Sequence, residues 1–424
     1  MPSSPTSTQR AGVLRVPGFA AFVLARLAAV LAMQMQAVVV AWQVYDITRD
    51  PMALAYVGLA QFIPMLLLLV PAGDWIDRFN RKTVLALSWV VEGICSALLL
   101  WLALHPQHGI VWVYAVLVLF GCGRAFTGPA LQSLLPQIVP REQLAQALAT
   151  NSMLMRAATI GGPIIGGLLY KLGGGSLTYG VCLASFSLAL VLLPLVPTYR
   201  ATTASAHTSG DLRHMWQRFG EGVRFIRAHP IVLGSISLDL FAVLLGGVVA
   251  LLPIYANEVL QVGPEGLGLL RSAIGFGEIA AGLYLSRRPF NQNVGITMFI
   301  AVLVFGLANL VFAFSSWFWL SFACLLVAGA ADMVSMYIRS ALVQFSTPDG
   351  MRGRVNAVNM LFVSSSNELG EFRAGTSASW VGAMPAAVLG GICTLVVAGL
   401  WMRQFPTLRR VKQFEEAGHT ASRR

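Results

Sequence analysis

Electric charge is scarce in this sequence. Only 11% of the 424 residues are charged, against about 25% in an ordinary soluble domain. Apolar residues reach 56%, and the mean hydropathy is +0.71. A surface built from so few charges would not keep a chain of this size dissolved in water. The composition therefore excludes a water-soluble globule. It predicts that most of the protein surface is in contact with the lipid bilayer.

The patterns of common catalytic sites are also missing. The sequence has no Walker phosphate loop, no histidines at metal-ligand spacing and no Gly-x-Ser-x-Gly turn. The five cysteines all fall inside apolar stretches without a Cys-x-x-Cys pair, so we interpret them as small core residues. We expect no enzyme activity, no cofactor and no metal site, and no segment has room for the soluble module of an ATP-driven pump.

Long apolar runs are abundant instead. Each approaches the roughly 20 residues that a helix needs to cross a bilayer, and none shows the ten-residue alternation of a membrane barrel. We predict an all-α integral membrane protein with twelve transmembrane helices, the first of which is too long for a removable signal peptide. The predicted stretches are 18–45, 52–72, 83–104, 110–136, 144–170, 176–197, 230–257, 265–286, 293–314, 316–344, 355–376 and 380–403.

The basic residues predict the orientation of these helices. If both termini are cytoplasmic, the inner segments hold 21 of the 29 lysines and arginines, whereas the outer loops hold only Arg49 and Lys171. Such an asymmetry is typical of the cytoplasmic side of short loops. It accounts for the net charge of +11 without nucleic acid, and it predicts that the basic tail contacts anionic lipid.

One long polar interruption divides the chain into two groups of six helices. Its first part resembles a flexible linker, and its second part repeats apolar residues at helical spacing against arginines, which predicts an amphipathic helix. The expected parts are a cytoplasmic N-terminal tail (1–17), a six-helix bundle (18–197), a cytoplasmic linker with an amphipathic helix (198–229), a second six-helix bundle (230–403) and a basic cytoplasmic tail (404–424).

The two groups resemble each other at a common offset. Gly73 and Arg78 correspond to Gly282 and Arg287, and several weaker matches share nearly the same spacing. A duplicated six-helix unit predicts two pseudo-symmetric bundles around a central cavity that opens to either side in turn.

The loop between the second and third stretches carries the first family signature. Its Gly-x-x-x-Asp-Arg-x-x-Arg-Lys pattern is formed by Gly73, Asp77, Arg78, Arg81 and Lys82 and resembles the signature loop of the major facilitator superfamily, with asparagine at the usual second glycine. The resemblance implies the major facilitator fold and a conformational latch. In that latch the acid holds a helix N-terminus, which is worth about 0.3 to 2 kcal/mol, and the cations bridge neighbouring helix ends.

A second signature lies in the fifth stretch. Gly162, Pro163, Gly166 and Gly167 fit a Gly-Pro-x-x-Gly-Gly pattern similar to that of exporters in the superfamily that exchange substrate for protons, although Ala158 stands where the longer motif has glycine. The alternative interpretation is close helix packing, because glycines let backbones approach. The two interpretations are compatible.

Four longer phrases narrow the resemblance. Residues 124–130, 134–142, 237–242 and 366–375 are similar to the enterobactin exporter branch, and the resemblance covers about 15 to 405. It implies export of a siderophore or a similar organic molecule across a bacterial inner membrane, driven by the proton gradient.

Twelve charges remain inside the predicted helices. A charge at the bilayer centre costs at least about 2.5 to 3.5 kcal/mol, so we expect these groups to face the interior and to find partners or water. Some of the acids could instead exchange a proton during transport. The charged residues are Arg26, Arg124, Arg156, Arg271, Arg339, Arg373, Glu92, Asp239, Glu278, Asp332, Glu368 and Glu371.

Four of these acids are candidates for proton coupling, in the order Asp239, Glu278, Glu368 and Glu92. Asp239 leads because it lies deep in its predicted helix with no basic residue within a turn. Two like acids that share a helix face, such as Glu368 and its neighbour three residues on, disfavour double ionisation, although Arg373 could relieve them. Asp332 and Arg339 are expected to form a structural pair or network.

Substrate contacts are expected from the first and fourth helices. Arg26 and Arg124 suit carboxylates or catecholates through the planar guanidinium fork, and Gln34 and Gln36 offer neutral hydrogen bonds.

The sequence therefore predicts a monomeric secondary transporter that exports a small organic molecule, siderophore-like or drug-like, in exchange for protons. Three alternatives stay open: a broad multidrug exporter, a proton-independent facilitator or importer, and a non-transporting membrane sensor.

Overall fold

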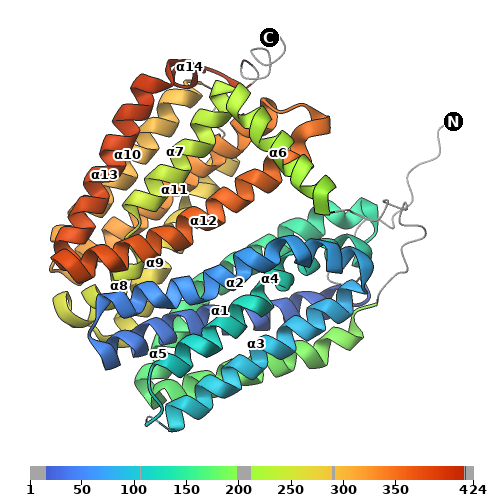
Figure 1. Ribbon diagram of the computed structural model, residues 1–424, viewed down its shortest axis with the longest axis vertical. Helices are drawn as coiled ribbons and strands as arrows, with labels where there is room; N and C mark the ends of the chain where they lie inside the picture. Colours follow the sequence, from blue (N-terminus) through green and yellow to red (C-terminus); the bar gives the residue numbers. More distant parts are fainter. Residues whose placement is uncertain (1–15, 106, 198–211, 289–291, 415, 417–424) are drawn as a thin grey trace. The chain divides into compact units, whose positions relative to one another are not determined.

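Helices account for the regular structure in the described part of the chain (Figure 1). The computed structural model describes residues 16–105, 107–197, 212–288, 292–414 and 416. The predicted N-terminal tail before residue 16, the linker residues 198–211 and the end of the basic tail from residue 417 lie outside this description. The longer helices are α1 (Phe19–Thr48), α2 (Pro51–Arg78), α3 (Arg81–Leu104), α4 (Val111–Ile138), α5 (Leu144–Leu192), α6 (Leu212–Ala228), α7 (Pro230–Gly246), α9 (Gly263–Arg287), α10 (Val294–Phe314), α11 (Phe318–Phe345), α12 (Asp349–Val381) and α13 (Ala383–Gln404).

The described chain forms two compact units. The first contains residues 16–37, 63–162 and 172–197, and the second contains residues 38–62, 163–171 and those from 212 onward. The division does not follow the expected boundary between the two six-helix groups, because α1, α2 and α5 each contribute one segment to the second unit.

Ten helical segments among the described residues are long and apolar enough to cross a membrane. One of them, Leu144–Leu195, has 52 residues and contains a break at Gly173 and Gly174, where Gly174 has φ +65°. This break separates the fifth and sixth predicted stretches. Helix α12 has 33 residues but is not among the ten. The number of twelve transmembrane helices remains a prediction.

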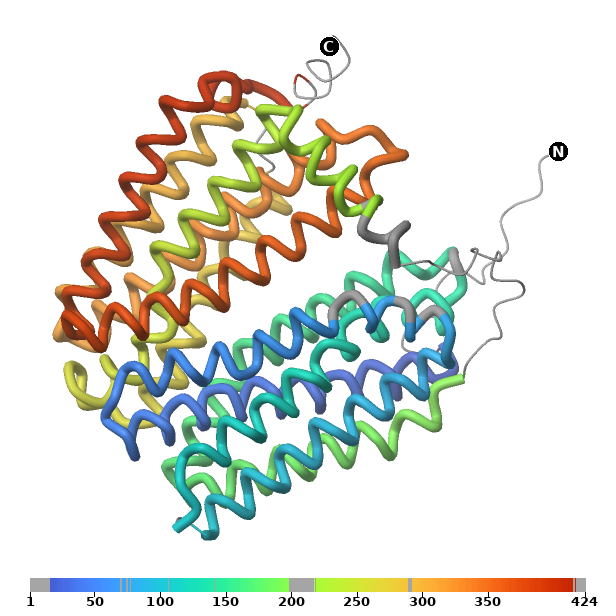
Figure 2. The backbone as a smooth tube through the Cα atoms, in the orientation of Figure 1, coloured from blue at the N-terminus to red at the C-terminus, as the bar shows by residue number. Residues whose placement is uncertain are grey.

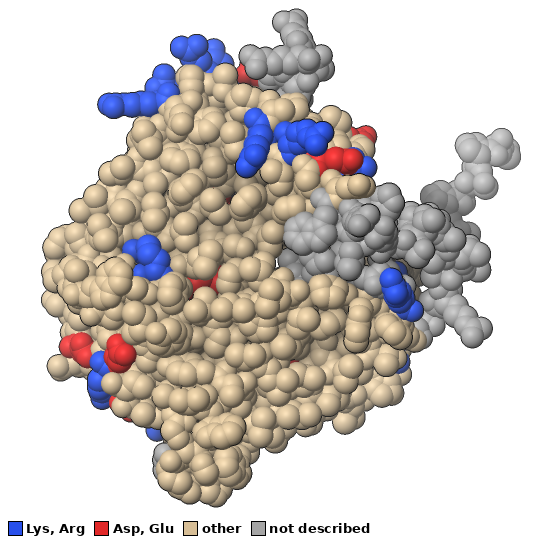
Figure 3. All heavy atoms as spheres, viewed as in Figure 1, with Lys and Arg blue, Asp and Glu red and all other residues tan. Residues whose placement is uncertain are grey.

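The charges avoid the long outer faces of the second unit. In the view of Figure 3, the surface over α10, α13 and α7 is largely uncharged, while lysines and arginines gather beside α14 (Pro406–Arg409). An apolar belt with charges at the helix ends is what a surface in contact with lipid requires.

The seventh predicted stretch, expected as one helix over 230–257, is interrupted. Helix α7 ends at Gly246, and the chain continues through η5 (Val249–Leu251), α8 (Leu252–Ile254) and the π-helical turn η6 (Tyr255–Val259). The break leaves carbonyl groups without helical partners, and Arg373 of α12 binds two of them. Its Nε donates to the Leu244 carbonyl at 3.0 Å, and its Nη2 donates to that of Gly247 at 3.2 Å. Broken helices are tolerated in membranes when neighbours satisfy the freed groups in this way.

Two segments outside the long spans pack against the second unit. The apolar face of α6 places Phe219, Val223 and Ile226 against a cluster that includes Val232 and Val358. The chain after α13 also folds back onto the unit. The side chains of Leu408, Val411 and Phe414 are buried, and the carbonyls of Val411 and Lys412 accept hydrogen bonds from Gly295 and Val294 at the start of α10.

Helices α9 and α11 cross at a pair of glycines. A Cβ atom at Gly277 would collide with the Leu326 carbonyl, and one at Gly329 would collide with the Ile274 carbonyl. Both obstacles are backbone atoms that cannot rotate away. The two helices can therefore approach this closely only because neither carries a side chain at the crossing.

We expect Gly277→Ala to lower the free energy of unfolding by about 1 to 3 kcal/mol, as overpacking of a tight core does. The matched control is Gly399→Ala in α13, where a Cβ would meet no atom within 4 Å; this change should be neutral or slightly stabilising. Thermal unfolding of the purified proteins in detergent measures both. Equal unfolding temperatures for the two variants would contradict the close crossing.

Candidate functional site

A buried ion pair joins α7 and α11 in the second unit. Arg339 Nη2 lies 2.7 Å from Asp239 Oδ1 and 3.6 Å from Asp332 Oδ1. Asp239 is 7% exposed and Arg339 8% exposed. Asp332 and Arg339 share α11 two turns apart, and Asp239 reaches the same guanidinium from α7. The three charges therefore form one network rather than a single pair.

This network changes the interpretation of Asp239. The sequence shows no cation within a turn of it on its own helix, yet Arg339 is brought to it from a helix 100 positions further along the chain. The leading proton-coupling candidate is thus an ion-paired carboxylate. A proton on Asp239 would neutralise it and weaken its hold on the arginine, so protonation and the α7–α11 contact are physically linked.

The other acids of the second unit occupy different positions. Glu278 is half-buried on α9. Glu368 and Glu371 both approach α2, because a Cβ at Gly58 would lie 3.9 Å from an Oε2 of each. The two hydrogen bonds of Arg373 described above go to backbone carbonyls at the α7 break, and its expected relief of these two acids stays a prediction.

In the first unit, α1 lies against α5 through the predicted substrate contacts. Arg26 Nη1 donates to Asn151 Oδ1 at 3.1 Å, and Gln34 Nε2 lies 3.5 Å from the Thr159 carbonyl. Gly162 lies next to Gln34, because an added Cβ would come within 2.5 Å of the Gln34 Cβ. The structure thereby brings two substrate candidates and the first residue of the glycine-proline motif to one helix contact.

Arg124 and Gln36, two further polar residues of the first unit, have different surroundings. Arg124 is half-buried on α4 and interacts electrostatically with Glu92 on α3, which is fully buried. Gln36, expected as a neutral substrate contact, is 2% exposed and accepts a hydrogen bond from Ser96 Oγ at 2.7 Å. A side chain so enclosed belongs to the interior of the unit in this structure, and its expected contact with substrate stays a prediction.

The signature loop holds helix ends together. Lys82 Nζ donates to the carbonyls of Pro194 at 3.0 Å and Val196 at 2.8 Å. Asn80 begins α3 by accepting a hydrogen bond from the Lys82 backbone, which gives the asparagine at the usual glycine position a capping role.

The rest of the signature loop is more open. Arg78 is exposed, Arg81 is half-buried, and a Cβ at Gly73 would meet no atom within 4 Å. The side chain of Asp77 lies outside the described part of the chain, so the latch itself stays a prediction.

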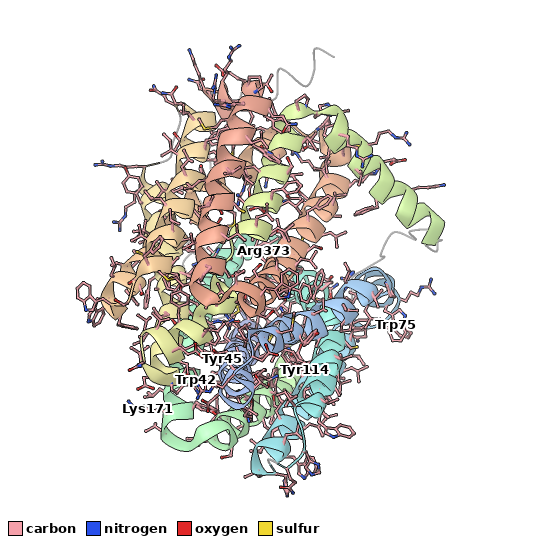
Figure 4. All side chains as sticks on the ribbon, turned by 60° about the vertical axis from the view of Figure 1, so that its left-hand side comes forward. Trp42, Tyr45, Trp75, Tyr114, Lys171 and Arg373 are labelled. Carbon is pink, nitrogen blue, oxygen red and sulfur yellow. The ribbon has the colours of Figure 1, made fainter. Side chains whose placement is uncertain are left out.

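Polar contacts gather at the turn from α1 into α2, which belongs to the second unit. Figure 2 traces the backbone of this turn. Tyr45 hydrogen-bonds Glu258, and Arg49 hydrogen-bonds Asn257, both partners lying in η6. Lys171 Nζ lies 2.5 Å from Glu265 Oε1 at the start of α9. We call these three contacts the Arg49 cluster; Figure 4 labels Tyr45 and Lys171 within it.

Buried apolar side chains pack next to the Arg49 cluster. Val38, Trp42 and Leu54 of α1 and α2 share one buried cluster with Tyr255 and Leu267. Inside the membrane, van der Waals packing between such side chains favours their contact, because lipid tails are as apolar as the side chains themselves. This packing adds to the polar contacts that hold the segments of α1 and α2 in the second unit.

The glycine-proline motif contributes a close backbone approach to the same unit. A Cβ at Gly167 would collide with the Pro264 carbonyl, and one at Gly268 would collide with the Pro163 carbonyl. The motif thus packs α5 against the start of α9, which agrees with the packing interpretation of this pattern.

Comparison with known families decides the identity of the fold. The family model described as transmembrane secretion effector matches residues 9–423, nearly the whole chain. The chain belongs to this family of major facilitator superfamily transporters.

Curated relatives of this transporter include the enterobactin exporter EntS of Escherichia coli O1:K1 and that of Shigella boydii serotype 18. Each is 26% identical over 401 residues, with 94% of both chains covered. The resemblance read from the sequence phrases is confirmed at the level of the family and of these relatives.

Solved structures agree on the fold. A bacterial homologue of the iron transporter ferroportin, in an inward-facing state, matches with a TM-score of 0.71 at 18% identity and covers 95% of this chain and 100% of its own. A bacterial homologue of the human lysosomal transporter Spinster matches with a TM-score of 0.70 at 16% identity and covers 93% and 98%. At these identities the likeness establishes the fold alone. The protein is a multi-pass membrane transporter and not an enzyme.

The Arg49 cluster is a set of contacts that the sequence analysis did not predict. A signal for part of it existed, because Arg49 and Lys171 are the only basic residues of the predicted outer loops, and Glu265 falls near the outer end of a predicted helix. The pair of Lys171 with Glu265 could have been predicted in advance, whereas Arg49 pairs with Asp46 and Asn257 and Glu258 binds Tyr45.

The buried pair should tolerate loss of both charges better than loss of one. We expect Asp239→Asn alone to destabilise the transporter by about 3 to 5 kcal/mol, because it leaves Arg339 partly uncompensated, and we expect Asp239→Asn with Arg339→Gln to recover part of that loss. A double-mutant cycle of thermal unfolding measures the coupling.

The control pair is Asp349 and Arg352 on α12, which lie 2.7 Å apart with side chains 88% and 52% exposed. Asp349→Asn should change stability by less than about 1 kcal/mol. Coupling energies of similar size for the two pairs would contradict the special weight given to the buried one.

Proposed function

We propose that this transporter exports a small organic molecule, siderophore-like or drug-like, across the bacterial inner membrane in exchange for protons. It acts as a monomer with both termini in the cytoplasm and alternates between two accessible states. The family match establishes that the protein is a transporter of the major facilitator superfamily. The direction of transport, the substrate and the coupling ion are our proposal.

The observation that carries the proton coupling is the Asp239–Arg339 contact at 2.7 Å inside an apolar unit. A charge is expensive at this depth, so Asp239 can be satisfied by Arg339 or by a proton, and the two occupants compete. When Asp239 is protonated, α7 and α11 lose the ion pair between Asp239 and Arg339. Proton binding can thereby alter a helix contact, which is the requirement for coupling an ion gradient to a conformational change.

The Arg49 cluster supports alternating access. Its charged members are partly exposed: the side chains of Lys171 and Glu265 are 57% and 31% exposed. Exposed ion pairs contribute at most about 1 kcal/mol, so their rupture costs little. In the predicted topology this end faces outward, and the cluster would close the outer side in one state and open in the other.

The substrate class follows from the α1–α5 contact and from the relatives. Arg26 and Gln34 on α1, together with Arg124 on α4, present guanidinium and amide donors that suit an anionic, oxygen-rich molecule. Relatives that match over nearly the whole chain are named as exporters of enterobactin. We therefore place siderophore-like anions first among the substrates to test.

The decisive assay uses inverted membrane vesicles with an imposed pH gradient. Accumulation of a catecholate driven by the gradient supports the proposal. Transport of many unrelated cations would favour a multidrug exporter, gradient-independent equilibration would favour a facilitator, and sealed vesicles that move no solute would favour a sensor.

We expect Asp239→Asn to abolish gradient-driven accumulation while substrate exchange without a gradient continues. The physical reason is that asparagine cannot bind or release the proton that competes with Arg339. Asp349→Asn, at an exposed position on α12, is the control and should export normally. Full proton-driven export by Asp239→Asn vesicles would remove Asp239 from the coupling mechanism.

We also expect Asp77→Asn to shift the balance between the two states, because the amide lacks the charge that the proposed latch needs. The reporter is Ala55→Cys, a buried position on α2 that packs against Gly375 of α12. Its labelling rate with a membrane-impermeant maleimide should change when Asp77→Asn is added. An unchanged rate would count against the latch.

A further inference from the structure

A second buried acid lies in the first unit, within a polar group that joins α1, α3 and α4. We define the Glu92 cluster as Gln36, Trp89, Glu92, Ser96 and Thr127, all of which are buried. Glu92 itself is 0% exposed. The mechanism proposed above makes no use of these residues.

The hydrogen bonds of the Glu92 cluster are incomplete. Thr127 Oγ1 donates to Glu92 Oε1 at 2.8 Å, and Ser96 Oγ donates to Gln36 Oε1 at 2.7 Å. Among the described residues, Glu92 Oε2, Gln36 Nε2 and Trp89 Nε1 have no hydrogen-bond partner. One carboxyl oxygen and two nitrogen donors of the Glu92 cluster therefore have unused hydrogen-bonding capacity among the described residues.

Close helix packing encloses the Glu92 side chain. Gly123 of α4 lies against Glu92, since an added Cβ would come within 3.2 Å of its Cγ. On the next face of α3, Gly93 packs near the Cβ of Phe186. Ser96 lies one turn after Glu92 on the same helix face, which brings Gln36 of α1 to the cluster. The carboxyl group is enclosed by three helices.

The charged surroundings of Glu92 differ from those of Asp239. Arg124 of α4 attracts Glu92 electrostatically, and Cys95 is the nearby titratable group on α3. The contacts from α1 and from the second part of α5 are the neutral Gln36 and Phe186. Glu92 Oε2 receives no hydrogen bond from any described residue, whereas Asp239 has Arg339 at 2.7 Å.

A fully buried ionised carboxylate with an unpartnered oxygen is costly, and such a group becomes neutral instead. We propose that Glu92 is a second proton-binding site of the transporter, with Thr127 and Gln36 as the residues that position its carboxyl group. With the proton bound, Oε2 carries a hydroxyl that needs no cation. When the proton leaves to water, the carboxylate requires donors, and Gln36 Nε2 and Trp89 Nε1 are the unused ones.

Proton loss at Glu92 thus draws the Gln36 side chain from Ser96 toward Glu92 and changes the α1–α3 contact. The physiological role of this site, which is to bind a second exchanged proton, rests on the proposed proton-coupled export. The binding itself is a property of the folded protein and can be measured without substrate or transport.

Infrared spectroscopy of the purified full-length protein in lipid provides that measurement. At neutral pH we expect a carboxyl C=O band from a protonated acid that is lost in Glu92→Gln and retained in Asp239→Asn. A band that survives Glu92→Gln, or that disappears in Asp239→Asn alone, overturns the assignment. If the Glu92 band is present but export needs no pH gradient, the proposed function fails and this inference stands.

Two conservative variants test the positioning roles and cover the case in which Glu92→Gln does not fold. Thr127→Val removes the hydroxyl donor at nearly constant volume and should move the band to a higher wavenumber, as a weaker hydrogen bond does. Gln36→Leu should alter the pH at which the band disappears, because it removes the donor for the ionised form. Gln61→Leu, which changes a glutamine of α2 that bonds the Val57 carbonyl, is the control. A band unmoved by Thr127→Val and Gln36→Leu contradicts the proposed cluster.

Discussion

A charged group inside a membrane helix must find a partner before the helix can be stable in lipid. Three arginines in the described structure, one buried and two half-buried, meet this demand in different ways. Arg339 binds the carboxylate of Asp239, Arg373 binds backbone carbonyls, and Arg26 binds an amide oxygen. These partners come from other helices, so each of these three arginines also connects two helices. The charges of this protein are few, but they join helices that are distant in the sequence.

Carboxylates under the same constraint have one additional solution, which is to bind a proton. The carboxylate of Asp239 already has Arg339 as its partner. A proton that binds Asp239 must therefore compete with this arginine. Glu92 has one hydroxyl donor and an oxygen without a hydrogen-bond partner among the described residues, so we propose that a proton neutralises it. If both proposals hold, the transporter has one proton site governed by competition with a cation and another governed by exclusion of water. The two sites would respond differently to the opening of a cavity.

Reversible closure needs contacts that are individually weak. The charged members of the Arg49 cluster meet this need because they are partly exposed. The tight contacts lie elsewhere: Gly277 and Gly329 lock α9 to α11 through backbone approach. The distribution of weak and tight contacts is compatible with our proposal of alternating access, which needs some contacts that open and others that hold.

Local patterns in the sequence were sufficient for the membrane environment, the helical class and the family. Length and hydropathy of a helix are properties of its own residues, and the loop from Gly73 to Lys82 is a contiguous motif, so neither depends on the rest of the fold. Even the break between the fifth and sixth stretches falls at adjacent glycines that are visible in the sequence. The sequence also predicted that Glu92 faces the interior, because charges in membrane helices avoid lipid.

Only the tertiary structure decided which residues meet. The sequence placed Asp239 without a cation, Gln36 in contact with substrate and Arg373 beside two acids, and the structure assigns each of them a partner from a distant helix. The helical period predicts which face of a helix is buried, but it carries no information on which other helix covers that face or at what height. Side chains 100 positions apart can therefore share a proton or a charge without any local sign of it.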